Sequence, residues 1–257
     1  MAAGTLAVMR KELTVYFTSP IFYLIGLFFL ILGGYFFYSN VLYYSLMSFQ
    51  AAQHPQLAAM LNPNQAVLQP LFSTLAIVFL MMVPVLTMRL LAEEKRSGTA
   101  ELLFTYPLTD WAVILGKYLA ALMVYLVLLL GTLVYPLLLA WVTRLDWGMV
   151  AGIYVGMVFF GGACLALGLF TSSFTENQIV AAVAAFVLLL LFWLIGWQQE
   201  WGAGGAGGVF AALSLFEHFS GFTRGVIDTR DVLFFLSFSY FFLFLTKGQL
   251  ESRRWRA

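Results

Sequence analysis

Long apolar runs alternate with short polar segments along nearly the whole chain. Six runs of about 20 residues stand out, because an α-helix rises about 1.5 Å per residue and so crosses the ~30 Å hydrocarbon core of a bilayer in that length. Backbone groups inside lipid must bond to one another, which favours helices. The pattern therefore predicts an all-α integral membrane protein with one transmembrane domain and six spans, at residues 20–38, 69–91, 113–142, 147–170, 178–197 and 231–247.

The first 18 residues have a different pattern. Their apolar residues recur at roughly helical spacing, with basic residues beside them, at Leu6, Met9, Leu13 and Phe17 and at Arg10 and Lys11. Charges in the middle of the stretch argue against a secretory signal peptide. We expect residues 1–18 to form an amphipathic helix that lies in the membrane interface and leads into the first span.

Composition supports lipid as the main solvent of the chain. Hydrophobic residues make up 62% of the sequence and charged residues 10%, whereas a soluble domain carries about 25% charged residues. The net charge of +1 leaves no free basic patch for nucleic acid. The single cysteine, Cys164, lies in an apolar run, so we expect it to be a small packing residue.

The distribution of basic residues predicts the orientation. If both termini are cytoplasmic, Arg144, Arg224 and Arg230 are the only ones of the 13 Lys and Arg residues that lie outside. Cytoplasmic loops carry the excess of basic residues, so we expect a multi-pass protein of the bacterial inner membrane with both termini inside. Residues 92–110 are then cytoplasmic, residues 171–177 form an inner turn, and residues 40–68 and 198–230 are outside.

The cytoplasmic segment 92–110 gathers an unusual share of the charge. We expect Gly98 to break the helix that leaves the second span, Thr99 to cap a short helix with Glu101 in its first turn, and Pro107 to stop it. Thr109 or Asp110 would then cap the third span. An apolar row of Leu102, Leu103 and Phe104 facing the cytosol favours a protein-docking element over an ordinary solvated loop.

The outer region 198–230 opens with the glycine-rich stretch GAGGAGG and continues with an apolar residue at every third position. Residues 209–225 are too short and too polar for a comfortable span, so we expect a re-entrant outer lid with a hinge at 202–208. Its candidate exit residues are Phe216, Glu217, His218, Phe219, Phe222 and Arg224. Local hydrogen bonding at the outer interface is the alternative for Glu217 and His218.

The sequence suggests roles for four further charged positions. Asp228, Arg230 and Asp231 stand at the start of the last span, where we expect them to pair and to cap the helix. Glu176 either caps the fifth span or contacts a partner.

Two stretches resemble a known family. EEKRSGTAELLFTYPLTDWAVILGKYLA, from Glu93, is similar to the segment after the second span in ABC-2 type transporter permeases. LSLFEHFSGFTRGVIDTRDVLFFLSFSYFFLFLT, from Leu213, resembles the C-terminal part of the gliding-motility (Gld) permeases. The resemblance implies a coupling helix that fits a cytosolic ABC ATPase, with matching positions at Glu94, Gly98, Thr99, Glu101 and Pro107, and with Glu93, Arg96, Leu102 and Leu103 in the same strip.

The same resemblance implies the partners. Six helices would form half of a translocation path, so it implies a second permease, identical or related, and a dimer of ATPase subunits that hold ATP and Mg²⁺. A periplasmic or auxiliary membrane subunit is compatible with it. This chain contains no GxxxxGK[ST] motif and no metal-ligand spacing, so we expect no enzyme activity and no cofactor in the subunit itself.

A different functional class is a non-transporting scaffold or force-transmitting subunit of an ATPase-linked motility or maturation complex, which would need the same spans without a continuous polar path. An ion-coupled carrier is disfavoured, because the centres of the spans hold almost no charge.

Overall fold

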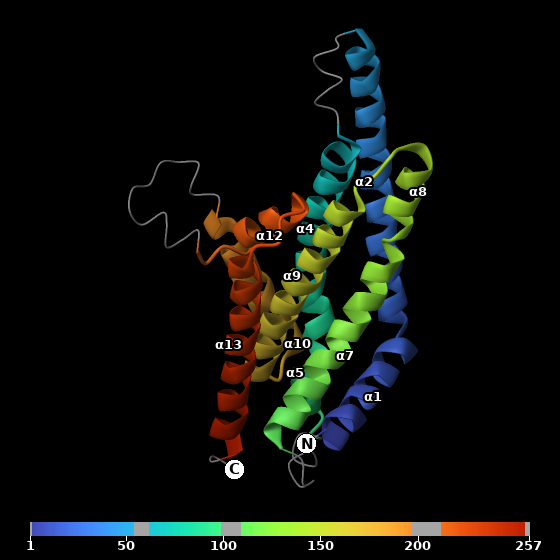
Figure 1. Cartoon of the computed structure of the whole chain (residues 1–257). Coiled ribbons are helices and arrows are strands. Elements are labelled where there is room, and N and C mark those ends of the chain that lie inside the picture. The colour runs from blue at the N-terminus through green and yellow to red at the C-terminus, as the bar shows by residue number, and fades with distance from the viewer. Residues whose placement is uncertain (1, 54–61, 99–108, 197–211, 255–257) are drawn as a thin grey trace.

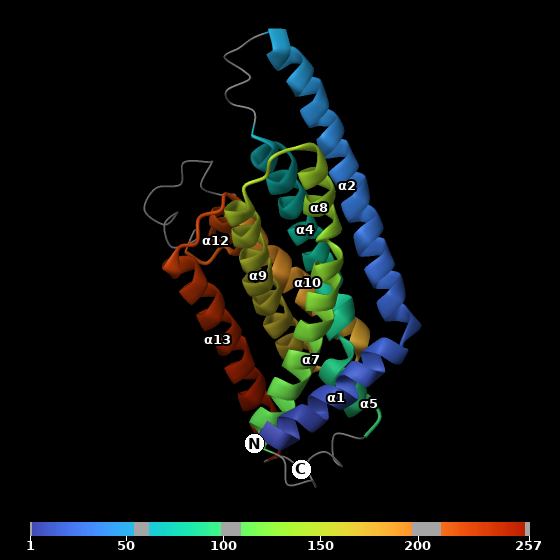
Figure 2. The same ribbon diagram turned by 45° about the vertical axis from the view of Figure 1, so that its right-hand side comes forward.

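The computed structural model describes residues 2–53, 62–98, 109–196 and 212–254, and every regular element in these ranges is a helix (Figures 1 and 2). The elements are α1 (Ala2–Thr18), α2 (Pro20–Gln53), η1 (Asn64–Leu68), α4 (Gln69–Thr87), α5 (Arg89–Arg96), α7 (Asp110–Gly131), α8 (Val134–Val142), α9 (Trp147–Phe174), α10 (Gln178–Leu194), α12 (Leu215–Thr223) and α13 (Thr229–Arg254).

Within the described ranges, five helical stretches are long and apolar enough to cross a membrane: Pro20–Ala51, Asn64–Arg96, Asp110–Val142, Trp147–Phe174 and Thr229–Ser252. The helix α10 is strongly apolar but has 17 residues, which is shorter than these. The all-α membrane architecture is confirmed, while the count of six spans stays a prediction.

The helix α9 forms the centre of the bundle, and α4, α7, α10, α12 and α13 pack around it. Glycines on α9 permit this close packing, because small residues let neighbouring helices approach. At Gly161 an added Cβ would lie 2.1 Å from the ring of Tyr125, which is fully buried. The Tyr125 hydroxyl donates a hydrogen bond to the Met157 carbonyl at 2.7 Å. Cys164 is buried on the same helix, as predicted for a packing residue.

The first long helix extends beyond the expected span. We predicted an end at residue 38 and an outer loop from residue 40, but α2 continues unbroken to Gln53. No glycine or proline follows Gly34 within the helix, so a change in hydropathy alone does not end it. Its 34 residues extend for ~51 Å at 1.5 Å per residue, which exceeds a ~30 Å hydrocarbon core. Part of α2 must therefore lie outside the hydrocarbon core.

Three other boundaries differ from the prediction. The third span is two helices, α7 and α8, with a break at Thr132, whose hydroxyl donates to the Leu129 carbonyl at 2.6 Å. Pro136 lies just after this break and cannot donate a backbone hydrogen bond. The inner turn is shorter than residues 171–177, because α9 continues to Phe174. The last helix is longer at both ends than residues 231–247.

Polar side chains cap several helix starts. The Thr109 hydroxyl accepts from the Ala112 amide at 3.3 Å, which confirms one of the two predicted caps of α7. Asn177 caps α10, so the alternative in which Glu176 is the cap is wrong. The Asp228 carboxylate accepts from the Arg230 amide at 2.9 Å at the start of α13. Gly98, with φ of 70°, follows the end of α5 and confirms the predicted helix break.

Candidate functional site

The helices α1, α5 and α7 lie together at one end of the bundle (Figure 2). Four charged side chains from these three helices meet there. The Lys117 ammonium, on α7, lies 2.7 Å from Glu12 Oε1 on α1 and 2.9 Å from Glu94 Oε1 on α5. Lys11 also contacts Glu94 Oε1 at 2.9 Å and lies 3.9 Å from Glu12 Oε1. We call these four residues the ionic cluster.

The four members of the ionic cluster differ in how far their side chains are buried. The Lys117 side chain is 1% exposed, Glu12 10% and Glu94 13%, whereas the Lys11 side chain is 55% exposed. Two lysines and two glutamates balance one another, as a buried charge requires. Partial burial acts to lower the pKa of Lys11, but the hydrogen bond and the charge of Glu94 outweigh it, so the pKa of Lys11 is raised. The cluster is thus a charged, closed network.

A close helix contact explains why Lys117 is buried. At the preceding residue, Gly116, an added Cβ would lie 2.8 Å from Val8 Cβ and 2.9 Å from the Thr5 carbonyl oxygen. Glycine therefore lets the backbone of α1 approach α7, and α1 covers the stem of Lys117. The inward face of α1 carries Val8 and Glu12, while Leu6 and Phe17 of the predicted apolar stripe are 61% and 40% exposed. The exposed apolar side of α1 is the side available to lipid.

Hydroxyl hydrogen bonds hold the other side of α5 to α9. The Ser172 hydroxyl on α9 accepts from the amides of Leu91 at 3.0 Å and Ala92 at 3.1 Å, and donates to the Met88 carbonyl at 3.1 Å. The Lys95 ammonium donates to the Ser173 carbonyl. The helix α5 therefore bridges two parts of the bundle, with an ionic contact to α1 and α7 and hydroxyl contacts to α9.

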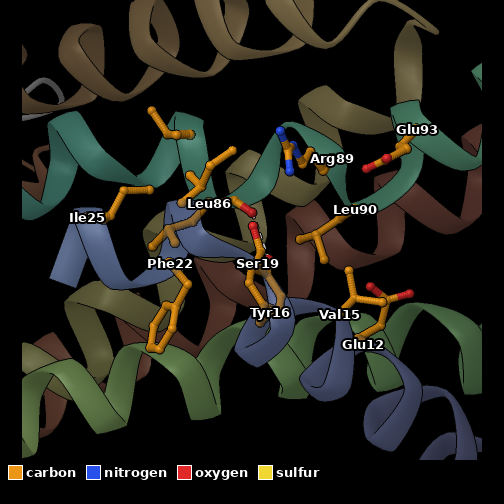
Figure 3. Close-up of a pocket in the computed structure, with 12 residues that line it drawn as sticks. Glu12, Val15, Tyr16, Ser19, Phe22, Ile25, Leu86, Arg89, Leu90 and Glu93 are labelled. Carbon is orange, nitrogen blue, oxygen red and sulfur yellow. Dashed lines mark hydrogen bonds between the residues drawn. The ribbon is translucent and has the colours of Figure 1, made fainter.

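A small pocket of about 60 Å³ lies beside α5, between α1 and α2 on one side and α4 on the other (Figure 3). Tyr16 lines the pocket, and the Tyr16 hydroxyl donates to the Leu86 carbonyl at 2.7 Å. Burial raises the pKa of Tyr16, so this hydroxyl stays protonated. Arg89 and Glu93 line one end of the pocket, on α5. Leu90, on the same side of α5, also lines the pocket and is 2% exposed, so the pocket is a small gap in an otherwise packed contact.

The structure divides the predicted coupling residues. Glu93, Arg96 and Gly98 are exposed at the end of α5, whereas Glu94 points into the ionic cluster. Thr99, Glu101, Leu102, Leu103 and Pro107 lie outside the described residues. The sequence analysis did not identify Lys117 and Glu12 as partners, although a lysine within an apolar span is a signal that a counter-charge lies nearby.

The predicted outer residues lie on and around α12, at the other end of the bundle from α1 (Figure 1). Its nine residues extend for ~13 Å at 1.5 Å per residue, which is too short to cross a bilayer. Phe219 and Phe222 are fully buried, Phe216 is partly buried, and Arg224 is exposed. The predicted hinge at residues 202–208 lies outside the described residues.

An ionisable pair connects α12 to α13. His218 Nδ1 lies 2.7 Å from Asp231 Oδ1, and the His218 ring stacks on Phe234 with centroids 3.9 Å apart. Asp231 therefore pairs with His218, whereas the sequence suggested pairing among Asp228, Arg230 and Asp231. The neighbouring Glu217 uses its backbone amide to donate to the Ser214 hydroxyl at 3.3 Å, which caps α12. This local bonding is the structural alternative that the sequence left open. No group of three or more His, Cys, Asp or Glu side chains arranged to hold a metal occurs among the described residues.

Comparison with known proteins gives one family and two curated relatives. Residues 6–244 match a family model described as "ABC-2 family transporter protein". The probable multidrug ABC transporter permease YbhR of Escherichia coli strain K12 is 30% identical over 123 residues, which is 46% of this chain and 32% of the relative. The protein of the same description from Escherichia coli O157:H7 matches equally. The matched stretch thus spans about a third of these relatives.

Proposed function

Because the chain belongs to the ABC-2 family of transporter proteins, we propose that it is the transmembrane permease subunit of an ABC-2 exporter. In this role it forms half of a translocation path in the bacterial inner membrane and pairs with a second permease. A dimeric cytosolic ABC ATPase, holding ATP and Mg²⁺, supplies the energy. The main support is the match to the family model over residues 6–244, together with the helical bundle of apolar spans.

Six spans fit the arrangement better than five. The start of α2 and the end of α13 lie at the same end of the bundle, which requires an even number of crossings (Figures 1 and 2). The apolar helix α10 supplies the sixth crossing between α9 and α13. With both termini in the cytoplasm, α1 lies in the inner membrane interface and the ionic cluster lies at the cytoplasmic side.

The docking surface for the ATPase would begin at the end of α5. Glu93 and Arg96 are exposed, and the turn at Gly98 ends the described part of this segment. Residues 99–108, which follow in the sequence, carry Thr99, Glu101 and the apolar row. An apolar row flanked by charges suits a partner groove, since its exposure to water would be unfavourable. We do not extend this role to Glu94, because its carboxylate faces Lys117 and Lys11.

At the outer end, we propose that α12 is a cover over the path between the two permeases, with residues 209–225 as a re-entrant lid. Two buried phenylalanines seat α12 against the bundle, and the His218–Asp231 pair fixes it to α13. The similarity of residues 213–246 to gliding-motility permeases leads us to place the protein in that group.

Co-purification tests the function directly. The tagged chain, extracted in mild detergent from its native host, should retain an ABC ATPase, and reconstitution of the two should raise the ATPase rate above that of the ATPase alone. The absence of any ABC ATPase in the purified complex would reject the proposal.

Cysteine labelling tests the orientation. A Gly98→Cys substitution in a Cys164→Ala background places one thiol after α5, where the backbone is exposed. We expect a membrane-impermeant maleimide to label it in inverted membrane vesicles and not in intact cells. Labelling in intact cells would reverse the topology and remove the docking surface from the cytoplasm.

A further inference from the structure

We propose that Lys117 is a positioning residue whose contact with Glu94 is a releasable link between α5 and the paired helices α1 and α7. The link opens and re-forms when the ATPase moves the end of α5, while the contact between Lys117 and Glu12 stays closed. This inference rests on the proposed function, because it assigns the movement of α5 to a partner ATPase.

The ionic cluster is asymmetric in a way that favours release at Glu94. Lys117 holds two carboxylates, so when Glu94 leaves, the buried ammonium keeps Glu12 at 2.7 Å. Lys11, with a side chain 55% exposed, regains water when it loses Glu94. A buried charge without a counter-charge is the costly outcome when a buried ion pair breaks. Opening at Glu94 avoids this outcome for both lysines.

Release at Glu12 would be far less favourable. The Glu12 side chain is 10% exposed, and the helix that carries it is packed against α7 at Gly116, where the two backbones approach closely. Separation of α1 from α7 would break this packing as well as the ion pair. The helices α1 and α7 consequently behave as one unit, and α5 is the element that moves against it.

The contacts along α5 provide a pivot and a moving end. The three hydrogen bonds of Ser172 join α9 to Met88, Leu91 and Ala92, at the beginning of the helix. Glu94 lies in the second half of the helix, which ends at Arg96 and is followed by the turn at Gly98. The long side chain of Lys95 also reaches α9, and its rotatable stem tolerates a change in the helix position.

Stability alone does not account for such a network. Well-packed apolar side chains of similar volume often stabilise a fold as well as a buried ion pair does, whereas charges specify a particular arrangement. Here the arrangement specified is the position of α5 against α1 and α7.

The test compares two glutamates that each pair with a lysine. Glu94→Gln removes the releasable contact, and Glu251→Gln removes the exposed pair with Lys247 on α13, at 2.9 Å, as the matched control. Each variant is reconstituted with the co-purifying ATPase. We expect Glu94→Gln to retain membrane yield and ATPase co-purification while the permease-dependent rise in ATPase rate disappears. The control should keep the rise.

Two further variants separate charge from packing. Lys117→Arg keeps the charge and should retain part of the stimulation. The triple variant Glu12→Gln, Glu94→Gln, Lys117→Met removes three charges together and leaves no charge of these three residues unpaired, so it should fold and bind the ATPase without stimulating it.

Wild-type stimulation in Glu94→Gln or in the triple variant would overturn the inference. Loss of ATPase co-purification in Glu94→Gln would also overturn it, by placing Glu94 in the docking surface, and so would failure of Glu94→Gln to reach the membrane. If the wild-type chain itself binds and stimulates no ABC ATPase, the proposed function fails instead, and the two failures are distinguishable.

Discussion

Replacement of Lys117 by methionine tests the ionic cluster through stability. The substitution keeps an unbranched apolar stem and removes the ammonium, which is 1% exposed. Glu12 then loses its partner at 2.7 Å and retains only Lys11 at 3.9 Å, whereas Glu94 keeps Lys11 at 2.9 Å. Removal of one partner from a buried ion pair typically costs ~3–5 kcal/mol, because the remaining charge is uncompensated. Since one of the two carboxylates keeps a close partner, we expect the lower end, about 3 kcal/mol.

The matched control is Lys247→Met on α13. Lys247 pairs with Glu251 at 2.9 Å, but the two side chains are 27% and 45% exposed. Ion pairs between solvent-accessible side chains contribute little to stability, so the control should lose much less free energy of unfolding than Lys117→Met. Denaturation of the purified proteins in detergent, followed by tryptophan fluorescence, measures both. Addition of Glu12→Gln to Lys117→Met should recover much of the loss, because it removes the uncompensated carboxylate.

Two results would refute this reasoning. Equal losses for Lys117→Met and Lys247→Met would mean that burial does not strengthen the contact of Lys117. A deeper loss in the double variant Lys117→Met, Glu12→Gln would mean that Glu12 stabilises the fold through some other contact than the one with Lys117.

Other substitutions give results of known direction. Gly161→Ala should destabilise the bundle by ~1–3 kcal/mol through overpacking, because the added Cβ would lie 2.1 Å from a buried tyrosine ring. In the same denaturation assay the control Gly248→Ala, whose Cβ would have nothing within 4 Å, should be neutral or stabilising by up to ~1 kcal/mol. Ser172→Ala should cost ~1–3 kcal/mol for each unsatisfied amide and speed hydrogen exchange at the start of α5; unchanged exchange there would contradict the pivot. Asp231→Asn should weaken the contact with His218 at 2.7 Å and raise hydrogen exchange in α12 relative to α9, and equal exchange with the wild type would argue against this attachment.

Local signals in the sequence predicted the membrane architecture and several helix ends. Apolar runs of spanning length identified the helices, Gly98 marked the end of α5, and Thr109 marked the start of α7. These predictions succeed because each depends on a few neighbouring residues: a glycine that adopts positive φ, or a hydroxyl that accepts from a nearby amide. Hydropathy was a poorer guide to where α2 ends, because a helix continues through polar residues until the backbone is interrupted.

Only the tertiary structure decided which charges meet. Glu12 and Lys117 are 105 positions apart in the sequence, and His218 and Asp231 belong to different helices. Each pairing depends on how one helix is rotated and translated against another, which is set by close contacts such as that of Gly116 with α1. The sequence by itself determined that α5 ends in charged residues shortly before a helix-breaking glycine, Gly98. The packing of α1 and α9 decided that the Glu94 side chain points inward to Lys117. In this position its carboxylate balances the charge of the buried Lys117 ammonium.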